Sequence, residues 1–201
     1  MICLYFMDLK IDKKITLIKK RLSQPLPGWE SQKKMAVMSI NPVTRLAFIP
    51  PADAKLAAVA IILFKEENTL KFFLTKRTSN VDHHKGQISF PGGAKDEGES
   101  FQDASLRETE EEIGINIDLD LLGALTPLYI PVSGFFIHSY VWYAKERPNT
   151  RINEDEVESV YDVNLDELKD KNLLSTKPIK IKGVSIEVPS FKFNSCTSWG
   201  A

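Results

Sequence analysis

Three glutamates have a spacing that suits metal chemistry. Glu108, Glu111 and Glu112 are placed at i, i+3 and i+4, so on a helix that advances about 100° per residue their carboxylates share one face. Like charges at this spacing repel one another unless a cation or a positively charged partner balances them. Carboxylate oxygens are the hard ligands that Mg²⁺ and Mn²⁺ prefer. The spacing therefore predicts a divalent-metal site.

Neighbouring residues supply the other parts of such a site. The guanidinium of Arg107 can bind a carboxylate with two parallel hydrogen bonds, and Glu99, which enters from the preceding loop, is the expected partner. We therefore expect Arg107 to orient the acidic cluster. Gly93 lies in a glycine-rich loop whose backbone can closely approach a metal or a phosphate. A loop, a helix and then carboxylates form an arrangement suited to phosphate chemistry.

A run of acidic residues is more often a solvated helix face than a site. The spacing of the whole segment argues against that interpretation. Its residues are Gly93, five residues, Glu99, seven residues, Arg107 and Glu108, two residues, Glu111 and Glu112, one residue, and Gly114. This pattern resembles the Nudix box. One departure is Thr109, where the family prefers an aliphatic residue; threonine keeps the shape and adds a hydroxyl.

The resemblance implies a Nudix hydrolase, an α/β protein with an αβα sandwich around a mixed β-sheet. Such an enzyme uses Mg²⁺ or Mn²⁺ to cleave a nucleoside diphosphate linked to another group. Glu108 and Glu112 are then the principal metal ligands and Glu111 is a third ligand or the base. The catalytic candidates are Glu111, Glu108, Glu112, Arg107 and Glu156, and the candidate metal set is Glu108, Glu112, Glu111, Gly93 and Glu99.

Glu156 enters this set from an acidic stretch that precedes a predicted strand. It lies in the region where Nudix enzymes often keep a loop carboxylate near the metals. The resemblance therefore makes Glu156 a candidate supplementary ligand or base. A solvated acidic turn is the alternative interpretation.

The segment directly upstream narrows the expected substrate. It reads Leu-Thr-Lys-Arg at residues 74–77, His-Lys-Gly-Gln at 84–87 and Phe-Pro-Gly-Gly at 90–93. These pieces resemble the signature of the coenzyme A pyrophosphatase subfamily, as do residues 125–141 and 156–168. The resemblance implies that coenzyme A or its thioesters, such as acyl-CoA, are split into 3′,5′-ADP and 4′-phosphopantetheine.

Such a substrate needs several kinds of contact. Coenzyme A carries a 3′-phosphate besides its diphosphate, and cationic side chains suit both. An amide can donate to a phosphate or to the pantetheine arm, and an aromatic ring can stack on adenine, although strand aromatics more often belong to the core. The candidate substrate-binding residues are Lys76, Arg77, His84, Gln87, Phe90 and Tyr129.

Around these residues, the hydrophobic pattern predicts one domain. We expect an N-terminal helix and lead-in over residues 1–30, with the helix at 9–22, and a single Nudix domain over 31–201. The lead-in is expected to continue as extended chain over residues 29–53. A helix should run from an N-cap at Ser100 to Gly114, and a short helix, capped by Asn164, over 165–171. The predicted strands are 55–64, 70–76, 117–127, 135–144 and 157–163, followed by a closing hairpin.

Composition limits the partners. The 201 residues include 26 Lys and Arg against 27 Asp and Glu, a net charge of −1, so no global positive field favours nucleic acid or an anionic membrane. No segment approaches the roughly 20 apolar residues of a membrane span. Two cysteines are too few for a disulfide framework, which favours the cytoplasm. We expect a small-molecule substrate, no nucleic-acid or membrane partner, and a monomer or homodimer.

Two alternative functions stay open, and the sequence differs from the resembling subfamily at its last residues. A Nudix hydrolase of another specificity, for ADP-ribose or dinucleoside polyphosphates, would share the box without needing the upstream signature. A non-hydrolytic nucleotide-sensing module is expected to have lost its carboxylates, which are all present here. The departure is at residues 198–201, where the subfamily continues into a terminal helix. The resemblance predicts that this helix is missing and that apolar sheet is exposed as a result.

Overall fold

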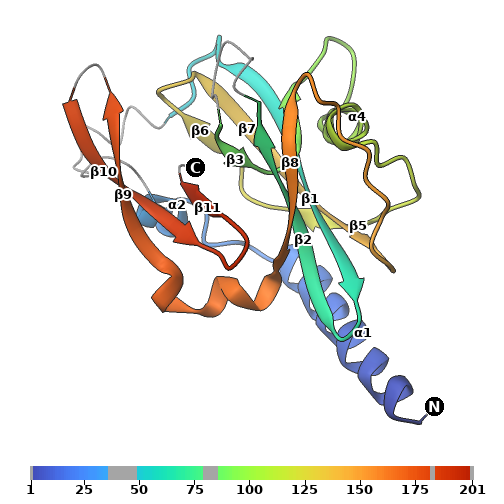
Figure 1. Cartoon of the computed structure of the whole chain (residues 1–201). Coiled ribbons are helices and arrows are strands. Elements are labelled where there is room, and N and C mark those ends of the chain that lie inside the picture. The colour runs from blue at the N-terminus through green and yellow to red at the C-terminus, as the bar shows by residue number, and fades with distance from the viewer. Residues whose placement is uncertain (1, 36–48, 79–85, 182–183, 200–201) are drawn as a thin grey trace.

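A computed structural model of the chain describes residues 2–35, 49–78, 86–181 and 184–199. In this part of the chain, eight strands form one mixed sheet in which β3, β2, β1, β7 and β5 are consecutive neighbours (Figure 1). The strands are β1 (Lys55–Glu66), β2 (Thr69–Arg77), β3 (Ile88–Ser89), β4 (Gly92–Ala94), β5 (Asp120–Ala124), β6 (Leu128–Ile130), β7 (Phe135–Ala144) and β8 (Val157–Asn164).

The centre of this sheet is the parallel pair of β1 and β7, which is in register from Lys55 opposite Phe135 to Phe64 opposite Ala144. Every other pairing in the sheet is antiparallel between described strands, with β4 on β1, β6 on β7 and β8 on β2. A strand buried on both faces reads as a continuous apolar run. The run of alanine, valine and isoleucine in β1 therefore explains its central place.

Successive side chains of the central strands supply two apolar layers, as the period of two requires. Ile62 and Phe64 of β1 belong to the layer beneath α4 (Phe101–Ile113), together with Ile113 of that helix. Leu63 of β1 belongs to the opposite layer, which also contains Phe193. Figure 1 shows α4 on one side of the large sheet and a smaller sheet on the other. This α/β arrangement with a central mixed sheet confirms the predicted fold class.

The second layer is covered by a helix and a small sheet. The helix is α1 (Ile2–Leu22), and the small antiparallel sheet has the order β11 (Thr197–Trp199), β10 (Val184–Lys192) and β9 (Leu174–Ile181). Phe193, directly after β10, meets Phe72 of β2 edge to face, with ring centroids 6.1 Å apart. These elements thus cover the layer that contains Leu63 in the described residues. None of the described helices is both long and apolar enough to cross a membrane.

Helix α1 contributes one apolar stripe to the core. Ile11 is 2% exposed, and Ile15, Ile18 and Leu22 pack against the same cluster, which is the i, i+4, i+7 and i+11 spacing of one helical face. Leu22 also meets β5 so closely that a Cβ on Gly123 would lie 2.7 Å from the Leu22 Cβ. The N-terminal helix therefore packs directly on the large sheet.

We expect Ile11→Ala to lower the free energy of unfolding by about 2–5 kcal/mol and the melting temperature by roughly 5–15 °C, because it leaves a cavity under α1. Leu17→Ala is the matched control, since Leu17 is on the same helix but 64% exposed, and it should change stability by less than about 0.5 kcal/mol. Thermal unfolding by circular dichroism measures both. Equal melting temperatures for the two variants would contradict the packing of α1.

Several elements differ from the sequence-based expectations. The described part of the lead-in contains α2 (Trp29–Gln32) and the 3₁₀ turn η1 (Lys33–Met35) where extended chain was expected. The strand expected at 117–127 is shorter, since β5 covers Asp120–Ala124, and β6, at Leu128–Ile130, lies beyond the predicted range. The short helix after Asn164 is a pair of 3₁₀ turns, η2 (Leu165–Lys169) and η3 (Lys171–Leu173), and Asn164 caps the first as predicted. The closing hairpin is confirmed as β9 and β10, and β11 adds a third strand.

Candidate active site

Helix α4 carries the acidic cluster and is fixed at both ends. The Ser100 side chain accepts a hydrogen bond from the Asp103 N–H at 3.1 Å, as an N-cap does. Gly114 ends the helix with φ of 69°, a left-handed conformation that favours glycine, and a Cβ there would lie 2.8 Å from the Arg151 carbonyl oxygen. The two predicted ends of the helix are therefore confirmed.

The buried face of α4 is anchored to β7. The Trp142 indole N–H donates to the Ser105 hydroxyl at 3.2 Å. Thr109, the departure from the family pattern, is fully buried and donates its hydroxyl to the Ser105 carbonyl oxygen at 2.8 Å. The extra hydroxyl is thus satisfied within the helix, and the rotation of α4 directs the Glu108 and Glu112 carboxylates toward the glycine-rich strand β4.

Glu112 is a buried carboxylate, with 1% of its surface exposed. One of its oxygens accepts a hydrogen bond from Arg77 Nη1 at 3.1 Å, and the other lies 3.4 Å from the Gly92 backbone N–H. Burial, together with the nearby carboxylates of Glu108 and Glu156, raises the pKa of Glu112 to about 7 against the opposing effect of Arg77. The interior at this point therefore disfavours a negative charge that nothing neutralises.

Arg107 ties the remaining acidic residues together. Its Nε and Nη2 bind the two oxygens of Glu99 at 3.2 and 2.9 Å, and its Nη1 donates to Glu108 at 2.9 Å and to Glu111 at 3.0 Å. Nη2 also donates to the Ala94 carbonyl oxygen at 3.0 Å. These bonds hold the pKa of Glu99 below its ordinary value. The geometry is the one expected for a residue that orients the glutamates.

Gly93 lies so close to Glu108 that a side chain at this position would require the Glu108 carboxylate to move. A Cβ on Gly93 would stand 2.3 Å from one Glu108 carboxylate oxygen and 2.5 Å from its carboxyl carbon. The Glu108 side chain is 14% exposed, and burial is the largest cause of its raised pKa. Strand β4 holds Gly93 in place by pairing it with Ala58 of β1. The glycine thus opens the space in which the Glu108 carboxylate sits.

Glu156 lies near the same carboxylates although it comes from a different part of the chain. It is half-buried, and its charge raises the pKa of both Glu108 and Glu112. Its carbonyl oxygen accepts a hydrogen bond from the Thr78 N–H at 2.9 Å, which joins this turn to the end of β2. The structure therefore brings Glu156 to the cluster, and its role as ligand or base stays a prediction.

The donor chemistry of this cluster fits a hard divalent cation. Glu108, Glu112 and Glu156 offer carboxylate oxygens at a partly buried place where negative charge is disfavoured, and Gly93 lets the Glu108 carboxylate lie directly against β4. Within the described residues, no three acidic, histidine or cysteine side chains converge closely enough to hold a metal ion. Guanidinium groups instead hold the carboxylates, Arg107 on Glu108 and Arg77 on Glu112.

Without metal, we expect the protein to lose stability as the pH rises from about 4.5 through about 7. The folded state holds a proton on Glu112, whose pKa is about 7, over a range in which an unfolded glutamate, with an ordinary pKa of 4.5, has released it. The contribution of Glu112 to the free energy of unfolding is therefore fully present below about pH 4.5 and is lost as the pH rises through about 7. Melting temperatures across this range, with a chelator present, measure the effect.

Glu112→Gln is the control for this pH dependence. It removes the titrating group, so the variant is expected to show a flatter profile than the wild type between these two pH values. Other titrating groups contribute equally to both proteins. Parallel profiles for wild type and variant would show that Glu112 does not hold the proton.

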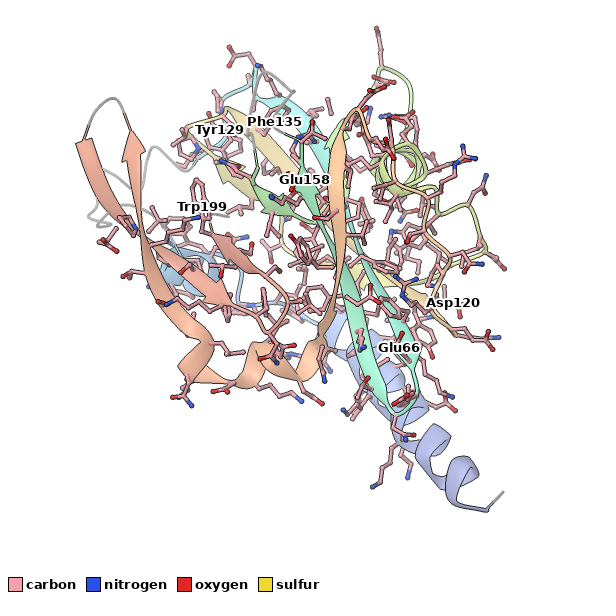
Figure 2. All side chains as sticks on the ribbon, viewed as in Figure 1. Glu66, Asp120, Tyr129, Phe135, Glu158 and Trp199 are labelled. Atoms are coloured by element: carbon pink, nitrogen blue, oxygen red, sulfur yellow. The ribbon has the colours of Figure 1, made fainter. Side chains whose placement is uncertain are left out.

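The predicted substrate-binding residues have different neighbours in the structure. His84 lies outside the described residues. Lys76 pairs with Glu158 of β8 at 2.5 Å, and the ring of Phe90 packs on Phe72 with centroids 5.8 Å apart. Tyr129 is on β6 opposite Phe136 of β7. Figure 2 shows Tyr129 near Phe135 at one end of the sheet. The substrate roles of all six candidates stay predictions.

Two features of the site were not anticipated from sequence. One is the ion pair between Arg77 and Glu112, which are 35 residues apart, although Arg77 was singled out as a ligand for phosphate. The other is the Gly92 N–H, which points at Glu112 from a strand that the hydrophobic pattern did not predict. The consecutive glycines were the available signal for a close backbone approach.

Comparison with known proteins places the chain among relatives. The chain is 32% identical over 148 residues to "Nudix hydrolase 3" of Caenorhabditis elegans, which covers 71% of this chain and 61% of that protein. It is 38% identical over 101 residues to "Uncharacterized Nudix hydrolase NudL" of Pectobacterium atrosepticum, covering 49% and 52%. It is 37% identical over 129 residues to "Nudix hydrolase 15, mitochondrial" of Arabidopsis thaliana, covering 59% and 43%. The chain thus spans about half the length of these curated relatives.

A family comparison points the same way. The family described as the NUDIX domain matches residues 54–181. That range is more than half of the chain and contains every carboxylate, arginine and glycine of the candidate site. On this match, the protein belongs to the Nudix family.

Proposed function

We propose that this protein is a metal-dependent diphosphatase. The observation that carries the proposal is the burial of Glu112 beside Glu108 and Glu156, at the place where Gly93 leaves space against the acidic helix. Buried carboxylates that raise one another's pKa cost stability unless a cation neutralises them. Carboxylates held in this way at the expense of stability are typical of functional sites.

The residues of the site would divide the chemistry between them. Glu108 and Glu112 would hold Mg²⁺ or Mn²⁺, with Glu99, Glu111 and the Gly93 carbonyl oxygen as further candidates. A bound divalent ion would neutralise diphosphate charge and lower the pKa of a water. Glu111, 51% exposed, or Glu156 would take the proton from the attacking water. Arg107 would keep the carboxylates in place through its bonds to Glu99, Glu108 and Ala94.

Within this class of reaction, we propose coenzyme A or its thioesters as substrate. Residues 74–77, 84–87 and 90–93 resemble the signature of the coenzyme A pyrophosphatase subfamily. The first two of these pieces join through the backbone, since the Arg77 N–H donates to the Gln87 carbonyl oxygen at 3.0 Å. This contact supports the proposal because it joins two pieces of the signature, and the Arg77 side chain of the first piece bonds to Glu112 at 3.1 Å. A cytoplasmic location and a monomeric or homodimeric state are further proposals that rest on composition alone.

The experiment is an incubation of the protein with coenzyme A, ADP-ribose and a diadenosine polyphosphate in turn, with Mg²⁺ or Mn²⁺, followed by chromatography of the products. Preferential formation of 3′,5′-ADP and 4′-phosphopantetheine would support both levels of the proposal. If only ADP-ribose or the diadenosine polyphosphate were cleaved, the diphosphatase proposal would stand and the coenzyme A assignment would be overturned. Binding of nucleotide without any cleavage would overturn the enzyme and favour a sensor.

A further inference from the structure

The ion pair between Arg77 and Glu112 is asymmetric in its exposure. The Glu112 side chain is 2% exposed and the Arg77 side chain is 26% exposed, and the atoms that join them lie 3.1 Å apart. The guanidinium therefore reaches from the solvent side to a carboxylate that is otherwise enclosed. Apart from this bond, the Glu112 carboxylate has a 3.4 Å contact with the Gly92 N–H, which is long for a hydrogen bond.

The backbone fixes where Arg77 stands. Its N–H donates to the Gln87 carbonyl oxygen at 3.0 Å, and its own carbonyl oxygen accepts from the Gly86 N–H at 3.2 Å. The pairing of β2 with β8 shifts register between Lys76 and Arg77. Such an irregularity bends a strand and re-aims its side chains. The anchored backbone and the register shift together account for the direction of the Arg77 side chain, which reaches Glu112 of α4.

Charge explains why a cation is needed there. Glu112 is buried, and its contact with a charged group among the described residues is the 3.1 Å ion pair with Arg77. Arg107, the other arginine at the cluster, is occupied by Glu99, Glu108, Glu111 and the Ala94 carbonyl oxygen. Among the described residues, Arg77 is thus the cation that contacts Glu112, and it does so through the Oε1 oxygen of a carboxylate that the proposed metal would share.

We propose that Arg77 is a resident counter-ion of Glu112 that a divalent cation must displace in order to bind. This inference rests on the proposed function, because it takes Glu112 to be a metal ligand. Arg77 stabilises the ionised form of Glu112 in the metal-free site, and it weakens metal binding by the free energy needed to break the pair. Arg77 is accordingly a positioning residue whose removal should tighten the binding of the metal.

The test uses Arg77→Met, with Lys71→Met as the matched control. Both residues are cations on β2 with side chains 26% exposed, but Lys71 pairs with Glu66, whose side chain is 36% exposed. Figure 2 shows Glu66 at the opposite end of the sheet from Glu158, the partner of Lys76. We expect Arg77→Met to lower the melting temperature without metal by roughly 5–10 °C, because it leaves Glu112 buried and unpaired. The control should change it by about 2 °C or less.

Titration calorimetry with Mn²⁺ supplies the second measurement, on wild type and both single variants. We expect the dissociation constant for Mn²⁺ to fall roughly tenfold in Arg77→Met, the factor expected when a competing pair of about 1.4 kcal/mol is removed. It should stay at the wild-type value in Lys71→Met. An unchanged or weaker affinity in Arg77→Met would overturn the inference, since Arg77 would then support the metal site and not compete with it.

The double variant Arg77→Met with Glu112→Gln keeps the test decisive if Arg77→Met folds poorly. It removes both charges, so its melting temperature should return to within a few degrees of the wild type. A double variant as unstable as the single one would mean that Arg77 matters for packing, and the inference would fail. If the wild type itself binds no Mn²⁺, the proposed metal-dependent function fails together with the inference. Wild-type binding with no gain in Arg77→Met overturns the inference alone.

Discussion

Glu112→Gln is expected to lower kcat for the proposed diphosphate substrate on the order of 10³-fold, while the protein keeps its fold. Loss of a principal metal ligand removes several kcal/mol of charge stabilisation from the transition state, and each 1.36 kcal/mol is a factor of about ten in rate. Glutamine has nearly the same shape and needs no buried charge, so the helix and its contacts with β7 should persist. Steady-state kinetics with Mg²⁺ or Mn²⁺, together with circular dichroism, measure the two effects separately.

Glu110→Gln is the matched control for this variant. Glu110 is on the same helix, but it is exposed, and it accepts a hydrogen bond from the Asn116 side chain at 2.7 Å on the side away from the cluster. The substitution makes the same chemical change and should alter kcat by less than about twofold, as is usual for surface positions. Comparable activity in the two variants would show that Glu112 does not bind the catalytic metal.

Gly93→Ala is expected to lower kcat/KM by about 10²-fold or more with little loss of stability. The new methyl group would meet the Glu108 carboxylate at 2.3 Å, and the cheapest response is for this flexible side chain to swing away. The fold loses little by that movement, whereas the proposed metal loses one ligand, and misplacement by about 1 Å can cost two orders of magnitude in rate. Kinetics and Mn²⁺ titration of the variant measure the loss.

Gly98→Ala provides the opposite pattern as a control. Gly98 lies in the loop before α4 with φ of 85°, and nothing stands within 4 Å of the position of its Cβ. Alanine is strained in that conformation, so this variant should lose about 1 kcal/mol of stability and keep its activity. If Gly93→Ala were fully active, the close approach of β4 to Glu108 would have no catalytic meaning.

The elements that could be predicted from sequence carry their own local signal. Continuous apolar runs located β1, β2 and β7, and the Ser100 cap and Gly114 located both ends of α4. Spacing alone predicted that Glu108 and Glu112 share a face and that Arg107 binds Glu99. In each of these cases the interacting groups lie in one strand, one helix or one short loop.

Features that depend on distant pairing could not be predicted in this way. Strands β3 and β4 are two and three residues long and are extended only because β2 and β1 bind them. The lead-in contains turns where prolines suggested extended chain. Most consequentially, the bond between Arg77 of β2 and Glu112 of α4 joins residues that are 35 positions apart, and no local pattern encodes it.

The parallel pairing of β1 with β7 has a consequence for how the protein folds. The two strands begin 80 residues apart, at Lys55 and Phe135, so the pair closes a long loop, and parallel ladders with large contact order form slowly. Trp142 of β7 anchors α4 through Ser105. During synthesis, the helix that bears the glutamates can therefore complete its packing only after β7 has left the ribosome. We expect the catalytic carboxylates to reach their buried positions late, after the β1–β2 hairpin has already formed.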